Sequence, residues 1–128
     1  MALASSIERR GLKTPQNAPT IVLMHGFPSS SHEFDTLIPL LAVKYHLIAP
    51  DYPGFGLRDA RSPARYAYTF DHLAQTMSDF LAKLKVNKYT MYLHDYGAPI
   101  GFRIILESSV IRLMHTLSSS DSWRILVR

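Results

Sequence analysis

Hydrophobic residues follow two different spacings along the chain. At 20–24, 46–50 and 89–93 they form short continuous runs bounded by turn-forming or polar residues. Such runs are typical of strands that are buried on both faces of a sheet. The sequence therefore predicts three buried strands.

Each predicted strand is followed by a segment with helical spacing of its apolar residues. In 34–41 these residues occupy the i, i+3, i+4 and i+7 positions of one helix face. Ser30 and Glu33 have the spacing of a capping box at the start of this helix. Pro39 lies inside it and predicts a kink or an early end, because proline removes one helical hydrogen bond.

The longest predicted helix spans 70–84, with the hydroxyl of Thr69 as its N-cap. A further helix is predicted over 98–106. Strands that alternate with helices indicate an α/β fold of three layers (α/β/α), in which helices cover both faces of a mostly parallel sheet.

In sheets of this kind, ligands bind in the crevice at the carboxyl ends of the strands. Two segments fall at such ends: 25–28, after the first strand, and the turn at Asp95, after the third. If the first and third strands are neighbours, these segments meet. We therefore expect the chemistry of the chain in these two loops.

Composition divides the chain into three parts, and its length allows one domain. Residues 1–19 contain glycine, prolines and polar residues and are predicted to be flexible. Residues 20–106 carry the alternating elements. Residues 107–128 become serine-rich and form a divergent tail, with room for one strand over 110–117.

Charge and composition exclude several classes of function. The net charge is +4, without a basic stripe interleaved with aromatics, so no nucleic-acid partner is expected. The absence of cysteine excludes disulfides and thiolate metal sites, and the histidines lack metal-ligand spacing. The apolar runs are too short to span a membrane, and the first residues lack the apolar stretch of a secretory signal. A cytoplasmic protein without metal or cofactor is therefore expected.

The segment His94-Asp95-Tyr96-Gly97 joins the third strand to the helix that follows. Taken alone, an aspartate there would be interpreted as a helix N-cap. Its position between an apolar strand and a glycine two residues later, with 25–28 upstream, favours a nucleophile. A carboxylate nucleophile attacks a substrate carbon, because acylation would give a mixed anhydride.

Three motifs occur in order with strand–helix spacing between them. They are His-Gly-Phe-Pro at 25–28, Asp-Tyr-Pro-Gly-Phe-Gly at 51–56 and His-Asp-Tyr-Gly-Ala-Pro at 94–99. Over 18–106 the chain resembles the Asp-nucleophile branch of the α/β hydrolase fold, the group of epoxide hydrolases and haloalkane dehalogenases. The resemblance implies a partial α/β hydrolase core and a small-molecule substrate.

The resemblance also implies roles for individual residues. Asp95 would form an alkyl-enzyme ester with the substrate, and water would then hydrolyse it. The backbone N–H groups of Phe27 and Tyr96 would form the oxyanion hole of the second step. The supporting positions in the two loops are His25, Gly26, Pro28, His94 and Gly97.

Two departures from the family pattern bear on the substrate and on the turn. Dehalogenases of this group supply side-chain N–H donors to the halide, commonly a Trp after the nucleophile and an Asn or Trp elsewhere. The matching residues are Tyr96 and Phe27, which favours epoxide hydrolysis and leaves dehalogenation as the alternative. Leu93 stands where the family favours a small residue and is expected to crowd the turn.

In the family, the cap domain, the last strands and the general-base histidine all follow the nucleophile helix. The 128 residues leave no room for them, and His115, twenty positions after Asp95, is a poor candidate for the base. We therefore expect a truncated hydrolase whose full-length form hydrolyses epoxides. A non-catalytic fragment is the third hypothesis, and the sequence indicates no oligomeric state.

Overall fold

A computed structural model describes residues 16–56, 62–107, 113–116 and 124–127, the last two segments as backbone strands only. Most of the predicted flexible segment, 1–19, lies outside the described residues. The part that alternates between strands and helices is described almost in full.

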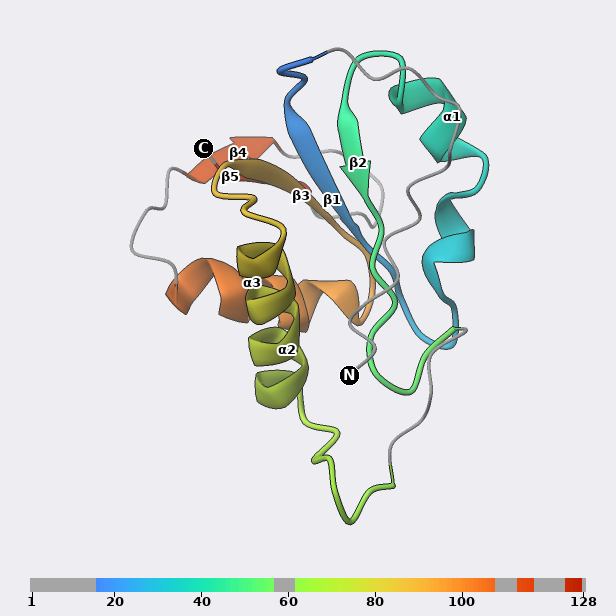
Figure 1. Ribbon diagram of the computed structural model, residues 1–128, viewed down its shortest axis with the longest axis vertical. Coiled ribbons are helices and arrows are strands. Elements are labelled where there is room, and N and C mark those ends of the chain that lie inside the picture. The colour runs from blue at the N-terminus through green and yellow to red at the C-terminus, as the bar shows by residue number, and fades with distance from the viewer. Residues whose placement is uncertain (1–15, 57–61, 108–112, 117–123, 128) are drawn as a thin grey trace.

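Five strands form one sheet in the order β2-β1-β3-β5-β4 (Figure 1). β1 (Thr20–Met24), β2 (His46–Ile48) and β3 (Tyr89–Leu93) are parallel. The three predicted strands are therefore confirmed, although β2 ends two residues earlier than predicted. The register pairs Met24 with Leu93, so β1 and β3 end side by side.

The chain after residue 107 contributes two strands, where the sequence predicted one over 110–117. β4 (Leu113–Thr116) and β5 (Arg124–Val127) pair with each other in antiparallel orientation. β5 also pairs antiparallel with β3. The last strand in the chain therefore lies between β3 and β4, an order that the local sequence pattern does not encode.

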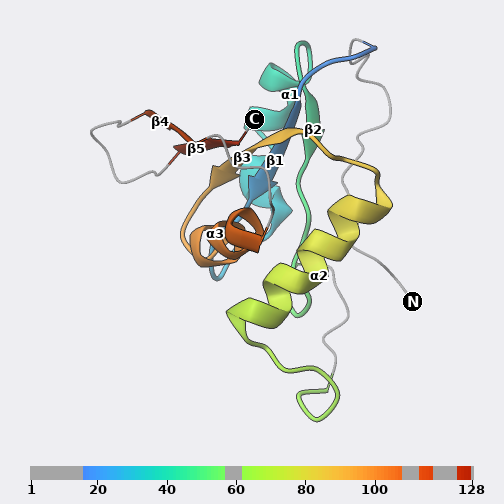
Figure 2. The same cartoon turned by 90° about the vertical axis from the view of Figure 1, so that its left-hand side faces the viewer.

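Helices cover both faces of the sheet and complete the three predicted layers. α2 (Phe70–Lys83) and α3 (Gly97–Glu107) lie on one face, while the 3-10 helix η1 (Ser31–Phe34) and α1 (Leu37–Leu41) lie on the other (Figures 1 and 2). The face under α2 and α3 holds the larger cluster of buried apolar side chains. Burial of each Leu, Ile or Met there contributes about 1.5–3 kcal/mol.

The predicted helix over 34–41 is divided into η1 and α1. Pro39 is the third residue of α1, where an N–H group would lack a helical acceptor in any case, so the proline is tolerated. The predicted capping box is wrong. Ser30 Oγ accepts a hydrogen bond from the N–H of His32 at 3.4 Å, but the Glu33 carboxylate turns toward the loop after β1.

α2 and its cap follow the prediction. The backbone of Thr69 is extended (φ −105°, ψ 155°), and its hydroxyl accepts a hydrogen bond from the N–H of His72 at 3.2 Å. The helical spacing buries Leu73, Met77 and Leu81 in the core. The capping hydroxyl and the helical spacing both depend on residues that are close in the sequence. They were therefore sufficient to predict this helix.

Leu93 ends β3 at the position where a small residue was expected. Its side chain is buried and packs on Gly101 of α3, where an added Cβ would overlap Leu93 Cδ2. The crowding predicted at the turn is therefore accommodated by a glycine in the following helix.

Candidate active site

Asp95 stands at the junction of β3 and α3 in a left-handed backbone conformation, with φ of 47°. This region is uncommon for residues other than glycine, although aspartate adopts it more readily than most. The Gly97 N–H donates to the His94 carbonyl at 2.8 Å, and the Ala98 N–H donates to the Asp95 carbonyl at 3.0 Å. The turn is thereby closed, and the Asp95 side chain is exposed.

Gly97 lets α3 begin directly against β1. A Cβ at this position would lie 2.8 Å from the carbonyl carbon of Met24 and would overlap its oxygen. The same oxygen accepts a hydrogen bond from the N–H of His94 at 3.2 Å. Strand and helix are therefore joined at this point with no space for a side chain.

The loop after β1 contacts Asp95 directly. The N–H of Phe27 donates to Asp95 Oδ1 at 2.8 Å, and a Cβ on Gly26 would lie 2.7 Å from Asp95 Cβ. The two predicted loops therefore meet. Hydrogen bonds from the N–H groups of Phe27 and Tyr96 hold the pKa of Asp95 below its ordinary value, and the nearby His94 acts in the same direction.

We expect the carboxyl group of Asp95 to titrate below pH 3.8, the ordinary value for aspartate. The folded-state pKa is lowered, so the ionised carboxylate stabilises the fold above the unfolded-state pKa. This contribution is lost as the pH falls through the folded-state pKa. A carboxyl ¹³C NMR titration measures the value, with the urea-unfolded chain as reference. A folded-state pKa at or above the unfolded one would contradict the hydrogen bonding described.

The peptide unit between Gly26 and Phe27 is fixed through its carbonyl group. The Gly26 oxygen accepts hydrogen bonds from His25 Nδ1 at 2.9 Å and from the Ser29 N–H at 3.1 Å. The C=O and N–H of a trans peptide point in opposite directions. These bonds therefore direct the N–H of Phe27 toward the carboxylate. The next peptide bond, from Phe27 to Pro28, is cis.

His25 is fully buried and stacks on Tyr52, with ring centroids 4.2 Å apart. Burial lowers the pKa of His25, partly opposed by its hydrogen bond to Gly26. Because Nδ1 donates to a carbonyl, the neutral ring carries its proton there, and Nε2 faces Asp51 Oδ1 at 3.9 Å. Asp51 accepts the N–H of Ser31 at 2.7 Å. It thereby satisfies a backbone donor of η1, outside its own loop.

Glu33 is a residue of this site that sequence reasoning missed. Its Oε2 accepts a hydrogen bond from the Gly26 N–H at 3.2 Å, and its Oε1 lies 2.5 Å from His94 Nδ1. The sequence signal at Glu33 was its spacing from Ser30, which pointed to a helix cap. Nothing local in the sequence indicated a contact with either of the two loops.

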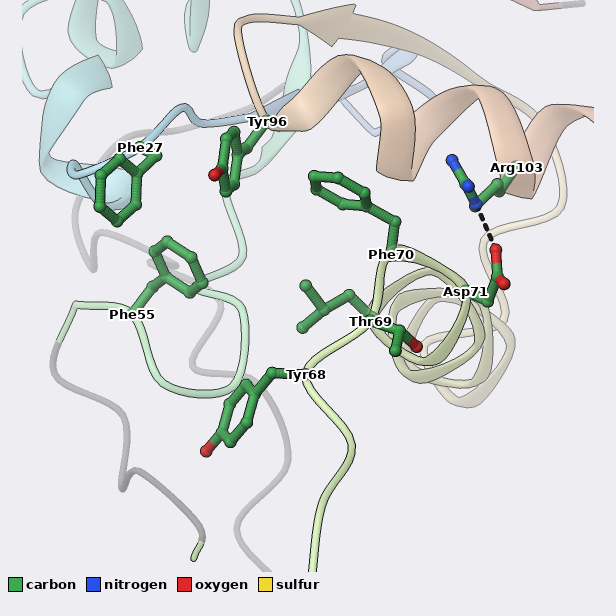
Figure 3. A pocket seen from close by; sticks show the side chains of 9 residues that line it. Phe27, Phe55, Tyr68, Thr69, Phe70, Asp71, Tyr96 and Arg103 are labelled. Carbon is green, nitrogen blue, oxygen red and sulfur yellow. Dashed lines mark hydrogen bonds and ion pairs between the residues drawn. The ribbon is translucent and has the colours of Figure 1, made fainter. Parts of the chain in front are cut away.

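Aromatic side chains from four segments line a cavity of about 570 Å³, whose lining includes Phe27 and Tyr96 from the two loops but not Asp95 itself. Phe27 and Tyr96 stack with their ring centroids 5.2 Å apart, and Phe70 meets Tyr96 edge-on at 5.2 Å. Phe55 packs against the edge of Phe27 at 6.1 Å. Figure 3 shows these rings around one space. Phe55 and Phe70 were not predicted as site residues, because only the fold brings them to the loops.

The cavity also has a polar end on α2 and α3 (Figure 3). Arg103 forms an ion pair through Nε with Asp71, and its Nη1 donates to the Pro99 carbonyl at 3.0 Å. The guanidinium carbon lies 5.7 Å from the centre of the Phe70 ring. The charge of Arg103 is therefore already engaged by groups of the protein.

Two other kinds of feature are absent from the part of the chain that the structure describes. His, Asp and Glu side chains form no group of three or more suited to hold a metal ion. No helix in the described segments has both the length and the apolar character needed to cross a bilayer.

Known proteins resemble the chain in sequence and in fold. It is 49% identical over 89 residues to an uncharacterized hydrolase of Saccharomyces cerevisiae, covering 70% of this chain and 30% of the yeast protein. It is 36% identical over 95 residues to a haloalkane dehalogenase of Psychrobacter cryohalolentis, covering 73% and 31% of the two chains. A solved epoxide hydrolase from hot-environment metagenomes superposes with a TM-score of 0.67 at 27% identity, covering 78% and 33%.

The chain spans about 30% of the length of the curated relatives it matches. A family described as the alpha/beta hydrolase fold matches residues 19–127, which is most of the chain. The fold, with its parallel strands, flanking helices and turn at Asp95, agrees with that match. The chain therefore belongs to the α/β hydrolase fold family.

Proposed function

We propose that Asp95 is the nucleophile of an epoxide hydrolase and that its Oδ2 attacks a ring carbon of the substrate. The observation that carries this proposal is the hydrogen bond from the Phe27 N–H to Asp95 Oδ1. It engages one carboxylate oxygen with the loop and leaves the other for attack. The carbon–oxygen bond of the epoxide breaks, its electron pair passes to the ring oxygen, and a proton is taken up there.

The resulting ester is hydrolysed by attack of water on its carbonyl carbon. Negative charge then develops on Oδ1, the oxygen that already accepts the Phe27 N–H. Donors placed where charge develops are the usual source of stabilisation in such a step. The N–H of Tyr96, which also lowers the pKa of Asp95, is the second donor. Collapse of the intermediate releases a diol and restores the carboxylate. We assign no described residue as the general base.

The cavity supports a substrate with an apolar substituent, because aromatic rings form most of its wall. The side chain of Phe27 offers no N–H donor to a leaving halide, while the hydroxyl of Tyr96 is available as a donor to an epoxide oxygen. The alternative, haloalkane dehalogenation by the same nucleophile, is supported by curated relatives that are themselves haloalkane dehalogenases.

Covalent labelling of the chain tests the proposal. The chain is incubated separately with excess styrene oxide and 1-bromobutane, and its intact mass is measured. An epoxide adds its whole mass, whereas a bromoalkane adds an alkyl group in place of hydrogen. We expect one styrene oxide adduct, located by peptide mapping on Asp95. An adduct with bromobutane alone would favour dehalogenation. No adduct with either reagent would contradict the proposal and favour a non-catalytic fragment.

A further inference from the structure

We propose that Glu33 is a positioning residue that holds the two loops of the site in register, so that the N–H of Phe27 stays aimed at Asp95 Oδ1. The inference rests on the proposed function and extends it to a residue outside the family motifs of the sequence. Glu33 lies in η1, on the opposite face of the sheet from α2 and α3 (Figure 1), and its side chain is 23% exposed.

The first arm of the contact fixes the loop after β1. Glu33 Oε2 accepts the N–H of Gly26 at 3.2 Å. The carbonyl group of Gly26 and the N–H of Phe27 belong to the same peptide unit. The N–H of Gly26 is thus held by Glu33 and its carbonyl by His25 and by the N–H of Ser29. A residue restrained at both ends has little freedom to rotate the following peptide.

The second arm is a close contact with the residue that follows β3. Glu33 Oε1 lies 2.5 Å from Nδ1 of His94, the residue immediately before Asp95. One carboxylate therefore contacts a neighbour of each hydrogen-bonding partner: Gly26 precedes Phe27, and His94 precedes Asp95. These two contacts of Glu33, here called the bridge, lie next to the hydrogen bond between Phe27 and Asp95, two residues that are 68 positions apart in the sequence.

Loss of the bridge should affect the two chemical steps unequally. Alkylation consumes negative charge on the carboxylate, so a weaker hydrogen bond at Oδ1 does not slow attack by Oδ2. Ester hydrolysis creates negative charge on Oδ1 and depends on the donor directly. Removal of a whole oxyanion donor costs about 100- to 1,000-fold in rate. A donor that is displaced but retained should cost about tenfold or more in hydrolysis.

The experiment compares Glu33→Ala, Glu33→Gln and Asp35→Asn with the parent chain. Asp35 is the matched control, because it is an acidic residue that follows the same short helix and its carboxylate contacts His32 at 3.1 Å. Styrene oxide adduct formation and adduct decay are followed separately by intact mass, and decay in H₂¹⁸O should place the label in the Asp95 carboxyl. We expect Glu33→Ala to slow decay about tenfold or more and to change formation less than about threefold.

Glu33→Gln should restore decay to near the parental rate, because the amide can accept from the Gly26 N–H and donate to the His94 ring. Asp35→Asn should match the parent in both steps. Equal slowing of both steps by Glu33→Ala would indicate general loss of structure, and unchanged decay would show that the bridge is not needed. Either result would overturn the proposal.

A second readout does not require chemistry. The amide proton of Phe27 should resonate downfield because it is bonded to a carboxylate, and Glu33→Ala should move it upfield while Asp35→Asn leaves it in place. If no adduct forms in any variant but the Phe27 signal responds to Glu33→Ala, the proposed function fails and the positioning role stands. If adducts form and neither the signal nor the decay rate changes, the positioning role fails alone.

Discussion

Replacement of Asp95 by asparagine is expected to abolish covalent labelling by styrene oxide. The amide has no anionic oxygen to attack a ring carbon, and loss of a nucleophile typically costs about 1,000-fold or more in rate. Asparagine has the same size, tolerates the left-handed backbone at this position, and its amide oxygen can accept the Phe27 N–H. The variant should therefore remain folded. Intact-mass measurement over the time in which the parent chain is fully labelled checks the result.

Asp79→Asn is the matched control for this substitution. Asp79 is exposed on α2, where it accepts a hydrogen bond from the Gln75 side chain at 2.9 Å, and it does not line the cavity. This variant should label at the parental rate. Persistent labelling of Asp95→Asn, with the adduct mapped to another carboxylate, would show that the nucleophile is assigned wrongly.

Replacement of Gly97 by alanine is expected to cause the largest loss of stability among the glycine variants of the site. The added methyl group would meet the carbonyl of Met24, and a backbone group in a central strand cannot rotate away as a side chain can. Overpacking of this kind costs about 1–3 kcal/mol, and a backbone neighbour places the substitution at the upper end, near 3 kcal/mol. Urea unfolding followed by circular dichroism measures the change in the free energy of unfolding.

Gly101→Ala provides the contrast, because the three atoms nearest to its methyl group all belong to the Leu93 side chain. Combining it with Leu93→Ala should recover part of its cost, which would appear as a favourable coupling energy in a double-mutant cycle. Gly97→Ala has no such partner, since the nearest atoms it meets are the carbonyl group and the Cβ of Met24, which a shorter side chain at position 24 would leave in place. An unfolding midpoint for Gly97→Ala equal to that of the parent would contradict the close approach of α3 and β1.

Local signals in the sequence were sufficient for the elements that build the site. The apolar runs of β1 and β3 and the helical spacing of α2 after Thr69 each depend on residues within a few positions of one another. These elements formed as predicted. The alternation of strands with helices also placed the loop after β1 and the turn at Asp95 at the same end of the sheet.

Contacts between distant residues required the tertiary structure. Glu33 has the spacing of a helix cap, yet its carboxylate bonds to Gly26 and approaches His94, because the fold places both within reach. Phe55 and Phe70 join the cavity for the same reason. The spacing of hydrophobic residues and the capping signals depend on residues that are close in the sequence. They therefore do not indicate which distant loop an acidic or aromatic side chain will contact.

By itself, the sequence determined the three parallel strands, the layer arrangement and the position of the two loops at the carboxyl ends of the first and third strands. Their meeting depended on the pairing of β1 with β3, which the structure shows. The tertiary structure alone decided three further features: the insertion of β5 beside β3, the accommodation of Leu93 by Gly101, and the Glu33 bridge. The physical reason is the same in each case. Strand pairing order, close packing and side-chain partners are fixed by three-dimensional proximity, whereas strand and helix formation depend on neighbours along the chain.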